Sequence, residues 1–454
     1  MRKIKAKDLT RCAMRLDSVD WISAIILLLG AVLVNVFFSY LSEGFFSSSV
    51  FATHIQSIMH VSLSPTWWKW FLGLLSNYSY VFAPLSGMLL LLLSVSLLLL
   101  IARGLCAFIT GLFFLSVWIS FWGVPGNWVF EYLFPGLFGI YAGLAKISDL
   151  WIHKHWKKRF FGEKFFKASF RVYWLLGIGL LSGIIAYAIY LSKDPNAYYI
   201  TVAWQSGLSI GVLLTMLLWV DGFREGGDIK NDSRLNRIPW IDVMTMTIGA
   251  MLVMQIHADI ALSWFTVEGY AHLIGSYEQS TSTHWIKPLL AWSVDHASSL
   301  MPLQFAFEAS LAVLLSLVLL RAPVLFATGC FLAILMFSEF GVASTVSNLP
   351  SSPRTWTWEL MFVTCSCFIL GFGQLAVLLR SNGLKQAVFG LSVFGALRFG
   401  WSCLIAIGCA FLLWGMIYKA HVFGSFYLAI ALHAGVSFFM LMIVLVVLDR
   451  FRRF

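Results

Sequence analysis

The sequence predicts an all-α, polytopic integral membrane protein of about twelve transmembrane helices, arranged as two parallel six-helix repeats. Three observations support this prediction. The chain of 454 residues is 60% hydrophobic and 11% charged, with a mean hydropathy of +0.84, which is too apolar for a soluble protein. Apolar runs of about 20 residues, the length that crosses the hydrocarbon core, recur along the chain. The two halves also match each other in sequence.

Twelve apolar segments are long enough to span a bilayer. They fall at 20–41, 81–101, 104–123, 126–147, 171–192, 199–220, 239–261, 300–320, 323–342, 356–378, 396–417 and 425–448. The first follows a basic tail and lacks a small-residue cleavage site, so we expect a retained signal anchor. The expected organisation is a cytoplasmic tail, a first repeat, a cytoplasmic linker and a second repeat, at 1–19, 20–224, 225–238 and 239–454.

The distribution of basic residues predicts the orientation. If the N-terminus is cytoplasmic, 26 of the 31 Lys and Arg residues fall on the cytoplasmic side and five fall in outer loops. This is the bias of the positive-inside rule, and a missed or invented span would scramble it. We therefore expect both termini in the cytoplasm. The net charge of +10 is explained by orientation, so the expected partner is the lipid bilayer and not nucleic acid.

Aligning the chain with itself shows the duplication. Residues 51–103 match 269–321 without a gap at an offset of 218, and the later helices match at an offset of 228. An even number of spans per unit predicts a parallel repeat about an axis along the membrane normal. The matched pairs include His54 with His272, Pro84 with Pro302, Arg103 with Arg321, Glu131 with Glu359, and Gly143 with Gly371.

A long outer loop follows the first helix of each repeat, at about 42–80 and 262–299, and both loops are rich in Trp, His and Phe. This composition suits short segments that lie at the outer interface. Six side chains would form a basic, aromatic rim for an anion or a headgroup: His54, Trp67 and Lys69, with His272, Trp285 and Lys287. Ordinary interfacial anchoring, kept by the duplication, is the other interpretation.

Three carboxylates are candidates for chemistry. Glu131 and Glu359 begin the fourth helix of each half in Trp-x-x-Glu settings, where they either cap the helix N-terminus or handle a proton or substrate. Glu308 lies about eight residues inside the eighth span, and its counterpart is the apolar Leu90. An unpaired charge there would cost a few kcal/mol, so Glu308 has either a functional role or a structural partner such as His or Tyr.

Polar side chains also occur near the outer ends of apolar helices. Gln205 and His433 occupy equivalent positions in the sixth helix of each half, and His257 lies in the seventh span. A haem held by two histidines is one hypothesis, and hydrogen-bonded core histidines are the alternative. The seven cysteines form no CxxC pair, and no metal site, phosphate loop, HExxH or GxSxG motif is present.

One set of short motifs points to a known family. Glu308 early in span eight is followed by Leu-Leu-Arg-Ala-Pro at 319–323 and by Trp-Thr-Trp-Glu at 356–359, and the first half has Trp-Val-Phe-Glu at 128–131. The first four helices of each half thus resemble the DoxX-like superfamily, which includes the membrane subunit of thiosulfate:quinone oxidoreductase. The resemblance implies a four-helix bundle in a bacterial inner membrane, with quinone or a redox partner. This chain departs from the family by its duplication, two added helices per copy and the lack of a thiol pair.

Three functional hypotheses follow. The first is a DoxX-like component that assists quinone-linked or thiol redox chemistry. The second is a transporter or channel for a small solute, with a midplane site that contains Glu308 and His433. The third is a non-catalytic assembly subunit, consistent with the lack of an enzyme motif. The sequence leaves open whether the chain is an enzyme and whether repeat-related His and Glu residues meet in space.

Overall fold

The computed structural model describes residues 20–121 without 63, 130–149, 205–217 without 215, 239–339 without 282, 358–379, 388, and 433–448 without 438 and 446. All regular structure in these residues is helical. The predicted spans at 171–192 and 396–417, the basic tail and the linker lie outside the described residues and stay predictions.

Six helices in the described part of the chain are long and apolar enough to cross a membrane. They are α2 (Trp21–Ser42), α5 (Ser79–Leu98), α6 (Arg103–Ser120), α12 (Trp240–Ala261), α15 (Ala297–Ser316) and α16 (Arg321–Glu339). Shorter apolar helices occur within α7 (Phe130–Ile147) and α17 (Trp358–Leu379), and at Gln205–Leu214 and His433–Leu445. All of them fall on predicted spans. A multi-span membrane protein is thus confirmed, whereas the number twelve stays a prediction.

Two helices end earlier than hydropathy predicts, because the backbone turns within the apolar run. Helix α5 ends at Leu98, after which Leu100 and Ala102 take left-handed φ values of 51° and 44°. The second half repeats this turn at Val318 and Leu320, with φ values of 51° and 47°. A left-handed residue other than glycine costs about 1–2 kcal/mol. Both copies nevertheless keep the turn, which places an arginine at the start of the next helix.

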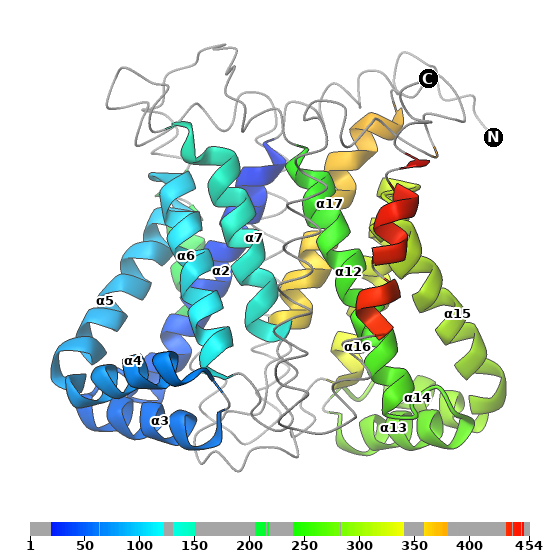
Figure 1. Ribbon diagram of the computed structural model, residues 1–454, viewed down its shortest axis with the longest axis horizontal. Coiled ribbons are helices and arrows are strands. Elements are labelled where there is room, and N and C mark those ends of the chain that lie inside the picture. The colour runs from blue at the N-terminus through cyan, green and yellow to red at the C-terminus, as the bar shows by residue number, and fades with distance from the viewer. Residues whose placement is uncertain are drawn as a thin grey trace. The chain divides into compact units, whose positions relative to one another are not determined.

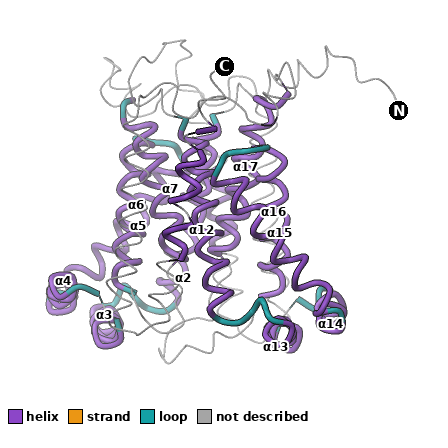
Figure 2. Tube along the Cα trace, turned by 45° about the vertical axis from the view of Figure 1, so that its right-hand side comes forward, coloured by secondary structure: helices purple, strands orange, loops and turns teal. Residues whose placement is uncertain are grey.

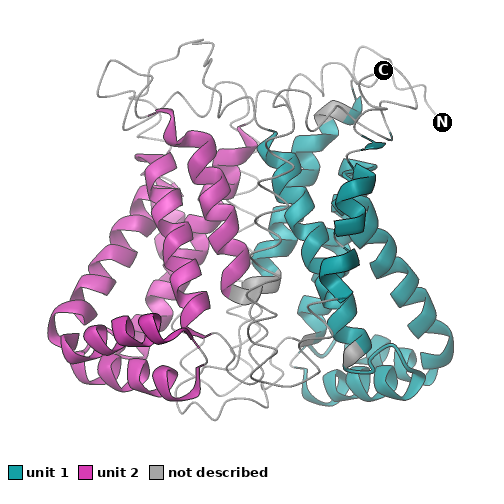
Figure 3. Cartoon of the chain, viewed as in Figure 1, with its two compact units in different colours: residues 1–17, 237–343, 355–454 teal, residues 18–236, 344–354 magenta. Residues whose placement is uncertain are grey.

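The chain forms two compact units, each described by itself (Figure 3). The unit drawn in magenta, which contains the first repeat, is called the first unit here, and the unit drawn in teal, which contains the second repeat, is called the second unit. In the first unit α2 packs on α5 and α6 packs along α7, and in the second α12 packs on α15 and α16 along α17 (Figure 1). Small residues allow the closest approach. A Cβ on Gly139 of α7 would lie 2.7 Å from Cα of Gly111 in α6, so only glycines fit at this crossing.

Each predicted outer loop contains two helices that lie across the end of its unit (Figure 2). They are α3 (Ser48–Val61) and α4 (Thr66–Asn77) in the first unit, and α13 (Val267–Ser280) and α14 (Lys287–Asp295) in the second. Helix α4 is amphipathic: Trp67, Trp70 and Phe71 are exposed, whereas Leu72 is buried. This pattern agrees with segments that lie at a membrane interface.

The packing gives the register between the repeats. Helix α2 corresponds to α12 with a shift of 219 residues (21 to 240), and α5 corresponds to α15 with a shift of 218 (79 to 297). Close contacts support both shifts. A Cβ on Gly30 would lie 3.0 Å from Leu97 Cβ, and a Cβ on Gly249 would lie 2.8 Å from the carbonyl carbon of Leu315.

Candidate functional site

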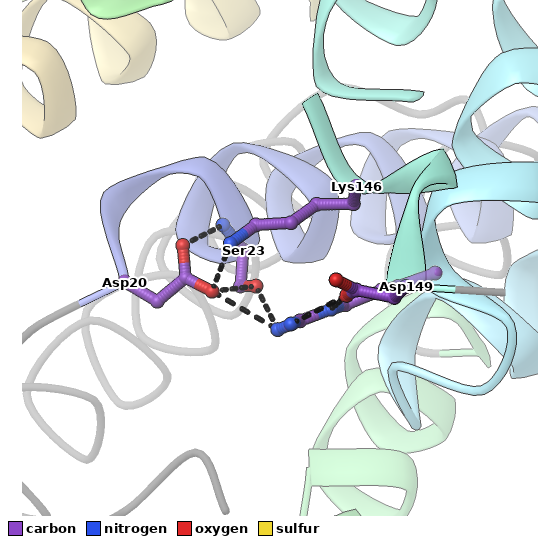
Figure 4. Close-up of polar contacts among 5 residues, drawn as sticks. Asp20, Ser23, Lys146 and Asp149 are labelled. Atoms are coloured by element: carbon purple, nitrogen blue, oxygen red, sulfur yellow. Dashed lines mark hydrogen bonds and ion pairs between the residues drawn. The ribbon is translucent and has the colours of Figure 1, made fainter. Parts of the chain in front are cut away.

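An ion-pair cluster joins three helices at the end of the first unit opposite α3 and α4 (Figure 4). Arg103, at the start of α6, donates from Nη1 to Asp20 Oδ2 at 2.9 Å and from Nη2 to Asp149 Oδ2 at 2.8 Å. Lys146 Nζ of α7 lies 2.8 Å from Asp20 Oδ2. Ser23 Oγ accepts from Arg103 Nη1 at 2.8 Å. Two cations and two anions balance, so the cluster is neutral overall.

Asp20 has two roles in this cluster. Its Oδ1 accepts from the backbone N of Ser23 at 3.2 Å, which caps α2. Burial would raise the pKa of Asp20, but the charges of Lys146 and Arg103 outweigh burial and hold that pKa well below its usual range. Asp20 is therefore ionised at neutral pH, as a clasp between helices requires.

The second unit has a simpler version of the same clasp. Arg321 Nη2 lies 3.2 Å from Asp242 Oδ2, and Gln374 Nε2 donates to Asp242 Oδ1 at 2.5 Å. By the repeat registers, Asp242 stands at the position of Ser23 and Gln374 at that of Lys146. Because each set balances its charge and connects neighbouring helices, we interpret both clusters as structural clasps. The duplication in the sequence predicts that Arg103 and Arg321 correspond, but it does not predict these ion pairs.

Glu308 is the candidate carboxyl group that the structure buries within an apolar helix. It lies within α15, a candidate membrane span, and only 5% of its surface is exposed. Gln304, one turn earlier, donates from Nε2 to Glu308 Oε1 at 2.8 Å. Met301, one further turn toward α13, packs against the cluster of apolar side chains that contains Tyr270. Glu308 is thus a buried carboxyl with an amide partner on the face of α15 that meets α13.

Tyr270 is the aromatic side chain that sequence reasoning missed at this site. It lies on α13 and is buried. Burial and, to a smaller extent, the carboxylate of Glu308 raise the pKa of Tyr270. The corresponding first-unit positions hold Phe51 and Leu90, both buried and apolar. That paired difference between the repeats was a signal that could have found Tyr270.

A second polar group lies on α12 and the helix His433–Leu445. His257 Nε2 lies 2.9 Å from Ser437 Oγ, and the rings of His257 and His433 have centroids 5.9 Å apart. Gln255 donates to Asp259 Oδ1 at 2.6 Å on the same helix. The structure therefore brings His257 and His433 together, whereas the transport hypothesis concerned Glu308 and His433 and stays a prediction. Among the described residues, no group of three or more His, Cys, Asp or Glu could hold a metal ion.

The other candidates are more scattered. Gln205 begins the helix Gln205–Leu214 and is exposed. Glu131 and Glu359 lie near the starts of α7 and α17, as predicted, but their side chains lie outside the described set. Their capping and proton-handling interpretations both stay predictions.

The predicted outer rim is less symmetric than its sequence match. Helices α3 and α13 correspond with a shift of 219 residues (48 to 267), so His54 matches Leu273 and not His272. His272 is exposed, whereas His54 packs edge-on against Phe45 with centroids 5.2 Å apart. Burial lowers the pKa of His54 to about 4, so its ring is neutral at pH 7 and supplies no charge to an anion.

The aromatic and lysine members of the rim do correspond. Trp67 and Trp285 are 62% and 63% exposed, and Lys69 and Lys287 are half-buried. Exposed tryptophans beside lysines are typical of interfacial anchors. The described geometry therefore favours anchoring over a shared anion site.

Comparison with known proteins adds no family. No protein-family model, curated protein or solved structure matches the chain. The helices themselves carry the conclusion: six described helices are long and apolar enough to cross a membrane, and a carboxyl group is buried in one of them. The chain is a multi-span, α-helical membrane protein.

Proposed function

We propose that the protein is a DoxX-like membrane component that binds a quinone head group at Glu308. The observation that carries this proposal is the burial of the Glu308 carboxyl in a membrane-spanning helix, held by Gln304. Ionisable groups at this depth are costly, and they usually mark a ligand or proton pathway. A carboxyl beside an amide and a phenol offers the donors and acceptors that a quinone carbonyl or hydroxyl needs.

The neighbouring surface suits a ligand that arrives through the bilayer. Leu303 and Phe307, on either side of Gln304 in the sequence, are 65% and 43% exposed on α15. In a membrane span, such exposed apolar side chains face lipid. A molecule with an apolar tail and a polar head could therefore reach the Gln304–Glu308 pair from the side. The resemblance of the Glu308 and Trp/Glu motifs to the DoxX-like superfamily favours quinone among such molecules.

A second candidate function is transport of a small polar solute. The contact of His257 with Ser437 and the nearby ring of His433 support transport. These side chains connect α12, which begins the second repeat in the sequence, with the helix His433–Leu445 near its end. Parallel six-helix halves are also an arrangement that transporters use. In this alternative Glu308 and His433 belong to a solute pathway.

The first test is a gentle purification of the tagged protein from its own membranes, followed by mass spectrometry of extracted quinones and lipids. We expect quinone well above the quinone-to-lipid ratio of the bulk membrane. Glu308→Leu should lower the retained quinone about tenfold, since losing a hydrogen bond to a charged or polar group costs about 1.5 kcal/mol. The matched control is Glu268→Leu, because Glu268 is an exposed carboxylate on α13.

Two outcomes would reject quinone binding. One is wild-type protein that carries quinone only at the bulk ratio, and the other is equal retention by Glu308→Leu and wild type. Uptake of labelled solutes into liposomes that contain the protein would then test the transport alternative, with His433→Ala as the variant.

A further inference from the structure

The first unit provides an internal reference for the second, because both pack in one register. Helices α2 and α5 contain no Asp, Glu, His, Lys or Arg. Their counterparts α12 and α15 contain Asp242, which belongs to the clasp, and also His257, Asp259 and Glu308. Helices α2 and α5 thus have no carboxylate, histidine or basic side chain at the three positions where α12 and α15 have His257, Asp259 and Glu308.

The differences extend to neighbouring hydrogen-bonding side chains. At six corresponding positions the second unit has more hydrogen-bonding capacity or a titratable group: Val36 and Gln255, Phe38 and His257, Tyr40 and Asp259, Phe51 and Tyr270, Ser86 and Gln304, and Leu90 and Glu308. The opposite change also occurs in α2, where Asn35, Ser39 and Ser42 correspond to Met254, Ala258 and Ala261. These three exchanges involve no titratable side chain.

These second-unit residues are not spread evenly over the unit. We call Gln255, His257, Asp259, Tyr270, Gln304 and Glu308 the polar layer. They lie on the parts of α12 and α15 toward α13, and on α13 itself, away from the Arg321–Asp242 clasp. At the clasp end the two units keep their arginines. Apart from Asp242 of the clasp, the side chains of Asp, Glu or His that α12 and α15 have and α2 and α5 lack therefore lie in this part of the second unit.

The packing around the changed positions is shared by both units, so the change is not a different fold. Phe38 packs against an apolar cluster that contains Ile210 of the helix Gln205–Leu214. Its counterpart His257 contacts Ser437 of the helix His433–Leu445. The same helix pair is thus joined by an apolar contact in one copy and by a hydrogen bond in the other. The first unit demonstrates that apolar side chains suffice for this architecture.

Polar groups that are unnecessary for the fold are a burden inside a membrane, where apolar side chains of similar size pack as well or better. We infer that the repeats have divided their roles: the second unit alone holds a ligand-binding polar layer, and the first unit is its structural counterpart. The ligand class is an amphiphile with a hydrogen-bonding head and an apolar body. The choice of quinone within that class rests on the proposed function, whereas the division of roles does not.

The test exchanges residues between the copies and measures thermal unfolding of detergent-washed protein from which lipids and quinones have been removed. Glu308→Leu, Tyr270→Phe and His257→Phe each install the first-unit residue. We expect apparent Tm values that stay within about 2 °C of wild type or rise, because the exchanged residues fit the same packing. The reverse variants Leu90→Glu and Phe38→His should lower Tm by several degrees, since they bury polar groups in an apolar unit.

A loss of Tm or of folded protein in all three second-unit variants would overturn the inference, because the polar layer would then be structural. An equal Tm for Leu90→Glu and wild type would overturn the inference as well. Adding decylubiquinone tests the ligand separately: it should raise the Tm of wild type but not of Glu308→Leu. If the three second-unit variants keep the Tm of wild type but decylubiquinone raises no Tm, quinone is rejected as the ligand and the division of roles stands.

Discussion

At the residue scale, the structure distinguishes charged side chains that pair between helices from a carboxyl group that is buried within one span. Arg103 and Asp20 form a closed, neutral cluster, whereas Glu308 has an amide partner within a span. The sequence could predict Glu308 as a candidate because hydropathy shows where a carboxylate is out of place. It could not predict the clasps, because Asp20 and Asp149 are 129 positions apart and meet only through Arg103.

Removing the charge of Asp20 tests the first clasp. Asp20→Asn keeps an N-cap for α2 but loses the ion pairs with Arg103 and Lys146. We expect a loss of about 1.5–3 kcal/mol of stability at neutral pH. Because the folded-state pKa of Asp20 is lowered, its contribution is present above the unfolded pKa of about 3.9 and is lost as the pH falls. Thermal unfolding between pH 7 and 3 should show a shallower acid decline in the variant. A parallel decline would contradict the assignment.

The lowered pKa of His54 predicts that stability depends on pH in a less acidic range than for Asp20. Its pKa is about 4 in the folded protein and about 6.5 in an unfolded chain, so folding excludes a proton between these values. Stability is complete above pH 6.5 and falls by up to about 3 kcal/mol as the pH drops toward 4. His54→Leu, which installs the second-unit residue, should remove that part of the decline. The matched control is His272→Leu, because His272 is an exposed histidine on α13.

At the element scale, hydropathy predicted the position of the described spans to within a few residues, since the bilayer imposes their length. It could not predict the left-handed turn at Leu100 and Ala102, because apolar residues carry no signal for that backbone. The interfacial helices α3 and α13 were expected only as short segments. The two repeats also differ in length by one residue between Ser64 and α4. The alignment at a single offset therefore matched His54 with His272, and only the packed helices show the corrected match.

The close crossing of α12 and α15 predicts that alanine substitutions at two glycines have opposite effects on stability. A Cβ on Gly249 would lie 2.4 Å from the backbone N of Ser316, so Gly249→Ala must push the helices apart. We expect a loss of about 1–3 kcal/mol. Gly275 in α13 has only a 3.9 Å contact with Val294, so Gly275→Ala should stabilise by about 0.5–1 kcal/mol through helix propensity. Thermal unfolding of both variants checks the pair, and equal effects would exclude the crossing.

At the scale of the whole molecule, the duplication was the most useful signal in the sequence. It predicted that each helix in one half has an equivalent helix in the other half. The left-handed turns and glycine contacts that both halves share agree with that prediction. It could not predict which copy buries the additional polar side chains, because a match reports what stayed the same. The contrast between Leu90 and Glu308 gained its meaning only when both proved to be buried.

The central claim is that the second repeat alone holds the ligand site. The most direct measurement is photo-crosslinking with an azido-substituted short-chain quinone in native membranes, followed by peptide mapping. We predict labelled peptides from α12, α13 or α15, with labelling suppressed by unmodified quinone and lost in Glu308→Leu. Equal labelling of the corresponding first-unit helices α2, α3 and α5, or labelling of that unit alone, would contradict the account.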